Sequence, residues 1–283
     1  MSGAQTTVLA VFGVLAGFAV GSFLCVVIER MPVPLAEPDE FGDMYAMRPW
    51  REVLSGSSRC DGCDADIKAY NMVPFFSWFV LRGKCRRCGS RIPALHPAVE
   101  LAVPVLAAAV VAEMGWGWRV VPLLWLVPVG IAVSVIDLRV LMVPTRIVWP
   151  AFFVSVALSG VAAAVESEPR WLLGGLIGIL TLAGPLALIW FVLPGGMGFG
   201  DVRLAVLLGW TVGFCGIGDS WSTAMFLAVA TLAAAAVIGI VMGIGGMIRE
   251  GRKAKVPFGP SLVIATLAVS ALSARILDGF AIS

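Results

Sequence analysis

The chain has 283 residues, of which 59% are hydrophobic and 13% are charged, and its formal net charge is +2 at pH 7. Soluble domains carry roughly 25% charged residues, so this composition excludes an ordinary soluble domain. The mean hydropathy of +0.96 comes from long apolar runs, which indicate a protein that folds in a lipid bilayer.

The apolar runs are each near the ~20 residues that cross a bilayer. We therefore predict an all-α polytopic membrane protein with about eight transmembrane helices. The first run follows a segment without Lys or Arg and precedes no evident cleavage site, so we expect a retained helix rather than a signal peptide. In chain order the runs are 7–28, 97–114, 119–136, 147–165, 171–193, 201–217, 221–248 and 258–277.

The basic residues predict the orientation of these helices. If the segment 29–96 is cytosolic, the loops at 138–146 and 249–256 and the start of the sixth run are cytosolic as well. That side then carries 17 of the 20 lysines and arginines. Cytosolic loops are enriched in basic residues, so we expect both termini outside and the 29–96 segment inside.

The 29–96 segment is the one long polar stretch, and it contains Cys60-x-x-Cys63 and Cys85-x-x-Cys88. Four thiolates at this spacing are typical of a tetrahedral zinc site, and four protein ligands leave no open position for catalysis. A cytosolic location disfavours disulfides. We predict a small four-cysteine zinc domain at 29–96, inserted between the first helix (7–28) and the remaining membrane domain (97–283).

Two other interpretations of the cysteines are weaker. A redox dithiol normally has a single CxxC on a βαβ frame. A nucleic-acid-binding ribbon needs a basic excess, whereas this segment has ten basic and nine acidic residues. We therefore expect no nucleic-acid partner.

Two aspartates at the edges of apolar runs are the candidate catalytic residues. Carboxylates in membrane segments are costly and are functional candidates for that reason. Asp137 closes one run and Asp201 opens another, both at the predicted cytosolic edge. Two carboxylates at one depth suit an aspartic peptidase, in which one activates water and the other polarises the scissile carbonyl. Taken singly, each is better explained as an interfacial helix cap, and the catalytic interpretation depends on the two aspartates together.

Glycines and a third acid accompany the aspartates. Gly198 and Gly200 belong to a glycine cluster directly before Asp201, which starts at Gly195. We expect them to let a substrate strand approach the backbone and an amide reach a developing oxyanion. Glu100, inside the second run, either supports the site or pairs locally. From the helix dipoles, Asp137 is predicted to hold the shared proton and Asp201 to be the ionised partner.

Several short strings along the chain resemble the bacterial prepilin leader peptidases, which are membrane aspartic peptidases of the G-x-G-D type. The N-terminal matches are Gly21-Ser22-Phe23-Leu24 with Arg30-x-Pro32, the two cysteine motifs with Leu81-Arg82-Gly83-Lys84, and Pro97-x-Val99-Glu100. The later matches are Asp137-Leu138-Arg139, Gly196-Met197-Gly198-x-Gly200-Asp201-Val202 and Pro257-Phe258-Gly259-Pro260. The ordered set is far more specific than any single string.

The resemblance implies cleavage of the leader of type IV prepilins, or of pilin-like (pseudopilin) secretion subunits, after a glycine at the cytosolic face of the bacterial inner (plasma) membrane. It also implies N-methylation of the new N-terminus with S-adenosylmethionine. Asp137 and Asp201 carry over as the catalytic pair, and Cys60, Cys63, Cys85 and Cys88 as zinc ligands.

This chain departs from the family at three positions. It has Cys25 where the family usually has Asn, and Glu29 and His96 where the family more often has Tyr. No Gly-rich nucleotide loop follows a strand, so no residues are assigned to S-adenosylmethionine. Two alternatives from other classes are a proton-coupled transporter, whose membrane acids form a relay, and a zinc-scaffolded assembly protein without chemistry.

Overall fold

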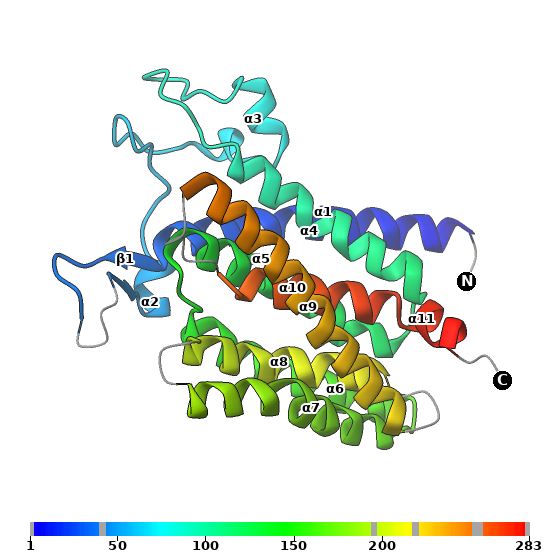
Figure 1. The fold of residues 1–283 in the computed structure, drawn as a ribbon. Helices are drawn as coiled ribbons and strands as arrows, with labels where there is room; N and C mark the ends of the chain where they lie inside the picture. The colour runs from blue at the N-terminus through cyan, green and yellow to red at the C-terminus, as the bar shows by residue number, and fades with distance from the viewer. Residues whose placement is uncertain (1–2, 40–43, 194–196, 217–220, 251–256, 281–283) are drawn as a thin grey trace. The chain divides into compact units, whose positions relative to one another are not determined.

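In the computed structural model, residues 3–39, 44–193, 197–216, 221–250 and 257–280 are described, and almost all regular structure is helical (Figure 1). The chain divides into two compact units, Met1–Ala108 and Ala109–Ser283. Within the described residues, seven helices are long and apolar enough to cross a membrane. The protein is therefore a multi-pass membrane protein, as the apolar runs predict.

The first unit contains α1 (Gly3–Arg30), the polar insertion and the start of α4 (Leu95–Met114). Helices α1 and α4 approach closely at two glycines of α1, Gly17 and Gly21. A Cβ on Gly17 would lie 2.8 Å from Pro104 Cβ, and one on Gly21 would lie 2.7 Å from Glu100 Cα. Small residues at this spacing are a common means of packing membrane helices, because they let the backbones approach.

The insertion has little regular structure. Strand β1 (Pro32–Pro34) pairs antiparallel with β2 (Tyr45–Met47), with Val33 opposite Ala46. The short helices α2 (Trp50–Val53), η1 (Ala69–Asn71) and α3 (Phe76–Val80) follow. A segment with so small a core would gain stability from a metal ion bound at the predicted four-cysteine site.

The second unit is a helix bundle. It comprises the last part of α4, then η2 (Trp118–Val120), α5 (Val121–Val140), α6 (Thr145–Val165), α7 (Arg170–Val192), α8 (Phe199–Gly216), α9 (Trp221–Glu250), α10 (Gly259–Ala271) and α11 (Ser273–Phe280). Helix α8 is the centre of this unit, because it packs against α5, α6, α7, α9 and α10. Every residue of α8 from Leu207 to Gly216 is buried.

The tightest pair in the bundle is α7 with α8. Gly174 and Gly178 on α7 face Gly209 and Gly213 on α8, and a Cβ on Gly178 would collide with the carbonyl oxygen of Gly209. Both helices thus present a small-xxx-small motif to each other, which brings the two backbones into direct contact.

Several helix bounds differ from the sequence-based runs. The apolar runs ended at 28 and 136, but helices α1 and α5 continue to Arg30 and Val140. Polarity ends an apolar run without ending a helix, because charged residues also form helical hydrogen bonds. The run 258–277 is divided at Leu272 into α10, with 13 residues, and the short α11. At 1.5 Å per residue, α10 covers about 20 Å, which is less than the ~30 Å hydrocarbon core.

Candidate active site and metal centre

Asp137 lies in the last turn of α5 and is buried, with 4% of its surface exposed. Leu141 ends the helix in the left-handed region (φ 56°), and its N–H donates to the carbonyl oxygen of Asp137 at 2.9 Å. The Asp137 carboxylate accepts a hydrogen bond at Oδ2 from the N–H of Gly259, at 3.0 Å. A buried carboxyl group requires such a partner, and here the first residue of α10 supplies it.

Asp201 lies in the first turn of α8 and is half-buried. The two glycines predicted to support it lie on either side of the turn. A Cβ on Gly198 would be 3.6 Å from Oδ2 of Asp201, so Gly198 borders the carboxylate. A Cβ on Gly200 would be 2.8 Å from Cβ of Val143, so Gly200 lets the start of α8 contact the segment that follows α5. The earlier glycines of the cluster, Gly195 and Gly196, lie outside the described residues.

The structure brings the two aspartates to one end of the second unit. Leu204 is three residues after Asp201 and therefore on the same face of α8. Its Cδ2 is 3.5 Å from the position of a Cβ on Gly259, and that Cβ would be 2.6 Å from Oδ2 of Asp137. Helix α8 also packs against both α5 and α10. Asp137, Gly259 and Asp201 thus form one constellation from α5, α10 and α8.

The nearby arginines are occupied elsewhere or face outward. Arg203 donates to Oγ1 of Thr145 at 2.6 Å, and its guanidinium lies 4.4 Å from the centre of the Phe199 ring. Arg139 is exposed.

Glu100 belongs to the first unit and has a local partner. It is 8% exposed, and its Oε2 accepts a hydrogen bond from the N–H of Phe75 at 2.6 Å. Phe75 has a φ of 62° and directly precedes α3, so Glu100 holds the chain at the start of that helix. Local pairing is one of the two alternatives that the sequence leaves open for Glu100; its role in support of the aspartates stays a prediction.

The four cysteines form a cluster that can hold a metal ion. All four Sγ atoms of Cys60, Cys63, Cys85 and Cys88 lie within 4.8 Å of one another, and those of Cys60 and Cys88 are 3.7 Å apart. A tetrahedral ion with metal–sulfur bonds of about 2.3 Å requires sulfur separations of about 3.8 Å. None of the four is in a disulfide. The donor set therefore fits a closed, four-coordinate metal site.

The two CxxC segments have the same backbone design. Each lies in a small hairpin closed by one bridge, between Arg59 and Asp66 in the first and between Lys84 and Arg91 in the second. The N–H of the leading cysteine donates across the hairpin, from Cys60 to Ala65 and from Cys85 to Ser90. Equivalent hairpins present their thiols to a shared point.

Ser90 is a site residue that the sequence analysis did not identify. Its Oγ lies 3.3 Å from Sγ of Cys60 and 3.1 Å from Sγ of Cys88. Hydrogen bonding, first of all with Ser90 and then with the Gly62 backbone, lowers the pKa of Cys60 to about 6, and the contact with Ser90 is also the largest cause of a lowered pKa at Cys88. Metals bind the thiolate, so Ser90 favours the binding form of two of the four ligands. The only sign of this role in the sequence is that Ser90 follows Cys88 by two residues.

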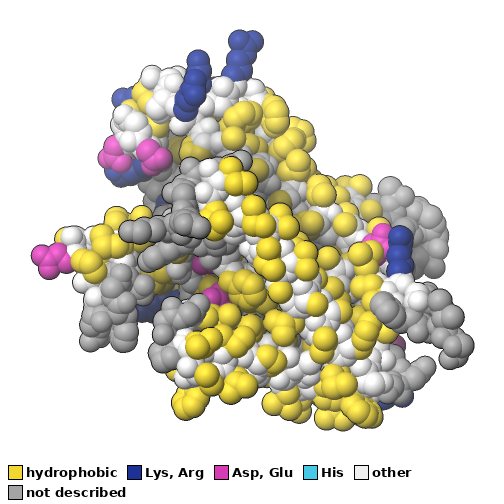
Figure 2. Space-filling model, in the orientation of Figure 1, with side chains coloured by type: hydrophobic (Ala, Val, Ile, Leu, Met, Phe, Trp, Pro, Cys, Tyr) yellow, Lys and Arg dark blue, Asp and Glu magenta, His cyan; other side chains and the backbone are white. Residues whose placement is uncertain are grey.

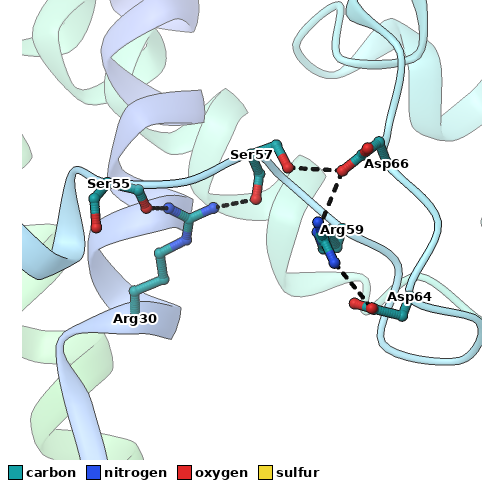
Figure 3. Close-up of polar contacts among 6 residues, drawn as sticks. All are labelled: Arg30, Ser55, Ser57, Arg59, Asp64 and Asp66. Atoms are coloured by element: carbon teal, nitrogen blue, oxygen red, sulfur yellow. Dashed lines mark hydrogen bonds and ion pairs between the residues drawn. The ribbon is translucent and has the colours of Figure 1, made fainter.

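Arg30, at the end of α1, holds the chain that leads into the first hairpin (Figure 3). Its guanidinium donates to the carbonyl oxygens of Ser55 at 2.8 Å and Ser57 at 2.9 Å. Ser57 in turn donates to Oδ1 of Asp66 at 2.7 Å, and Asp66 pairs with Arg59 at 3.2 Å. This chain of contacts connects a membrane helix to the metal hairpin.

His96 contacts Cys25 and Glu29, the other two positions that the resemblance predicts to depart from the family pattern. Nε2 of His96 and Oε1 of Glu29 are 2.8 Å apart, and Sγ of Cys25 donates to the carbonyl oxygen of His96 at 3.7 Å. The departures therefore form one local set between α1 and the start of α4.

Two family models match the chain. One is described as the bacterial peptidase A24 N-terminal domain and matches residues 15–114. The other is described as the type IV leader peptidase family and matches residues 124–244. The first match includes the cysteine cluster, and the second includes both Asp137 and Asp201.

Three curated relatives, each described as a prepilin leader peptidase/N-methyltransferase, match over most of their length. The protein of Stutzerimonas stutzeri is 32% identical over 88% of this chain and 86% of the relative. The protein of Aeromonas hydrophila is 31% identical over 87% of this chain and 84% of the relative. The protein of Xanthomonas campestris pv. campestris is 31% identical over 93% of this chain and 91% of the relative. No solved structure matches significantly.

Proposed function

Because the chain belongs to the type IV leader peptidase family, a group of membrane peptidases, we propose that Asp137 and Asp201 are its catalytic pair and that it removes the leaders of type IV prepilins or pilin-like secretion subunits. The observation that carries this proposal is the constellation of a buried Asp137, the Gly259 amide and Asp201 at one end of the bundle. Cleavage after a glycine, next to the substrate's own apolar helix, suits carboxylates at a membrane edge.

In this mechanism the two aspartates share the acid and base roles. One carboxylate takes a proton from the attacking water, and the other, protonated, donates to the scissile carbonyl oxygen. The Gly259 N–H holds Oδ2 of Asp137 as an acceptor, so the chemistry at Asp137 falls to Oδ1. The assignment of the shared proton to Asp137 stays a prediction. If Asp137 holds that proton, Oδ1 is the atom that carries it. Gly198 borders the Asp201 carboxylate and leaves that side open to a substrate strand.

Zinc is the metal that best suits the cysteine cluster. Four thiolates in a closed tetrahedral set are typical of structural zinc, which contributes folding energy rather than chemistry. The names of the relatives support methyl transfer to the new N-terminus, with S-adenosylmethionine as donor, as a second activity. The charge bias supports an orientation in the inner membrane with the insertion and both aspartates on the cytosolic side.

The test is cleavage of a candidate prepilin by the purified full-length protein. Asp137→Asn and Asp201→Asn each remove one acid–base group, so each should lower kcat at least about 100-fold. Asp61→Asn is the matched control, because Asp61 is an exposed acid beside the metal cluster. Leader removal is measured by mass spectrometry, in which a gain of one methyl group on the product reports the second activity.

Undiminished cleavage by either variant would refute the catalytic pair. An equal loss in Asp61→Asn would attribute the effect to general damage. Cleavage without the methyl group in the presence of S-adenosylmethionine would refute methyl transfer alone.

A further inference from the structure

The insertion contains an open cavity of about 450 Å³ that no role described above uses. Its lining residues include Trp78, the basic residues Arg82, Lys84 and Arg91, and Ala94. All of these residues belong to the first unit. The cavity lies beside the second metal hairpin but contains none of the four cysteines.

The wall of the cavity is fixed by short contacts. Nε1 of Trp78 donates to the carbonyl oxygen of Ile92 at 3.1 Å. The N–H of Ile92 donates to the carbonyl oxygen of Gly83 at 2.8 Å. Gly83 has a φ of 65°, and a Cβ there would be 2.9 Å from the Trp78 ring. Such a frame holds the shape of the cavity without a ligand.

The charge of the cavity is of one sign. Arg82, Lys84 and Arg91 line it, and no Asp or Glu does. Within the described residues, none of these three side chains takes part in an ion pair, whereas Arg59, Arg170 and Arg275 all do. Three cations around one hollow attract an anion, and guanidinium groups suit the oxygens of a phosphate.

The cavity lies next to one end of a membrane helix. Ala94, in its wall, directly precedes α4, which is one of the membrane-spanning helices. On the other side, α3 leads into the cavity with three large apolar side chains exposed: Phe76 at 60%, Phe79 at 55% and Val80 at 74%. In Figure 2, hydrophobic side chains over the α3 region stand next to Lys and Arg side chains. Aromatic residues beside basic ones are typical of a membrane interface.

We propose that this cavity binds the phosphate of an anionic phospholipid headgroup. Arg82, Lys84 and Arg91 contact the phosphate, and the exposed side chains of α3 lie among the adjoining acyl chains. Basic pockets beside membrane helices bind headgroups in this way. A bound lipid attaches the metal domain to the bilayer surface, in addition to the Arg30 contacts that connect this domain to α1.

The experiment measures lipid binding to the full-length protein, delipidated in neutral detergent, by native mass spectrometry. Phosphatidylglycerol is compared with phosphatidylcholine of the same acyl chains. We expect wild type to prefer phosphatidylglycerol, and R82Q/K84Q/R91Q to bind it roughly 100-fold more weakly, since each cation near an anionic surface contributes about fivefold. The single variants Lys84→Gln and Arg91→Gln should each lose about fivefold.

The matched control is R48Q/R51Q/K68Q, which removes the same charge from exposed basic residues of the same unit outside the cavity and outside both CxxC motifs. It should bind phosphatidylglycerol within a factor of about three of wild type. Metal content and thermal unfolding are recorded for both triple variants, and if the cavity triple does not fold, the single variants decide.

Four results would overturn the proposal. They are equal binding of the two lipids, unchanged affinity in the cavity variants, an equal loss in the control, and binding of inorganic phosphate without binding of the lipid. An acidic peptide that binds wild type more tightly than phosphatidylglycerol would assign the cavity to a protein partner instead.

Discussion

At Gly259 the packing around Asp137 leaves no space for a side chain. A Cβ there would be 2.6 Å from Oδ2 of Asp137 and 3.5 Å from Leu204. Gly259 therefore serves Asp137 in two ways: its N–H binds the carboxylate, and its missing side chain lets α10 approach α5. Its φ lies outside the left-handed region, so space, and not backbone conformation, requires glycine here.

Gly259→Ala should lower kcat for leader cleavage by about 100-fold, because displacement of a reacting group by about 1 Å costs that much. The amide donor remains, so the loss reports the position of the carboxylate. Gly245→Ala, in α9, is the control, since nothing lies within 4 Å of a Cβ there. A Gly259→Ala protein with full activity would remove Gly259 from the active constellation.

The helices of the second unit are held together by close backbone contacts and a few buried polar pairs. The α7–α8 glycines form the tightest contact, and α6 joins α8 through two side-chain hydrogen bonds. In these, Nε1 of Trp210 donates to Oγ of Ser159 at 3.1 Å, and the hydroxyls of Ser155 and Thr211 are 3.4 Å apart. Lipid gives no hydrophobic drive to pack one apolar helix on another, so such contacts decide which helices are neighbours. They also hold α8, and with it Asp201, in place.

Gly178→Ala and Gly213→Ala should each destabilise the bundle by about 1–3 kcal/mol, because the added Cβ meets backbone that cannot rotate away. Thermal unfolding in detergent measures the effect as a lowered Tm. Gly184→Ala, also on α7, meets nothing within 4 Å and should leave the Tm unchanged. Equal Tm values for Gly178→Ala and Gly184→Ala would show that the two helices do not pack through these glycines.

At the scale of the whole molecule, the two units are stabilised by different means. The second unit buries long apolar helices around α8. In the insertion of the first unit, the two-stranded sheet and short helices enclose little, and the cysteine cluster connects segments 28 residues apart. A metal ion bound by the cluster would therefore be the main constraint on residues 57–92.

Removal of the metal with a chelator should expose Arg59, Lys68 and Lys84 to trypsin, while the helical circular dichroism stays nearly unchanged. Zinc added back should restore protection, because the thiolates reform the site. Cys63→Ser should behave like the chelated protein, whereas Cys25→Ser should not, since Cys25 lies in α1 outside the cluster. Trypsin resistance that persists without metal would contradict this role.

The sequence by itself determined the features that depend on composition and short spacing. Apolar runs of bilayer length predict membrane helices, and seven of the eight have the length to cross. The CxxC spacing predicts the cysteine cluster, because two residues between thiols already set their geometry. Asp137 and Asp201 were found as acids in apolar runs, and the ordered motifs indicated the family that the comparisons confirmed.

Only the tertiary structure decided which residues meet. The bond between Asp137 and Gly259 joins positions 122 residues apart, and no local pattern predicts such a contact. The same holds for the pairing of Gly178 with Gly209 and for the cations that surround the cavity at Trp78. In a bilayer, hydrophobicity determines that a segment forms a helix, but contacts of small residues and buried polar groups determine its neighbours. Asp137 on α5 and Asp201 on α8 lie at one end of the bundle for that reason, since both helices pack against α10.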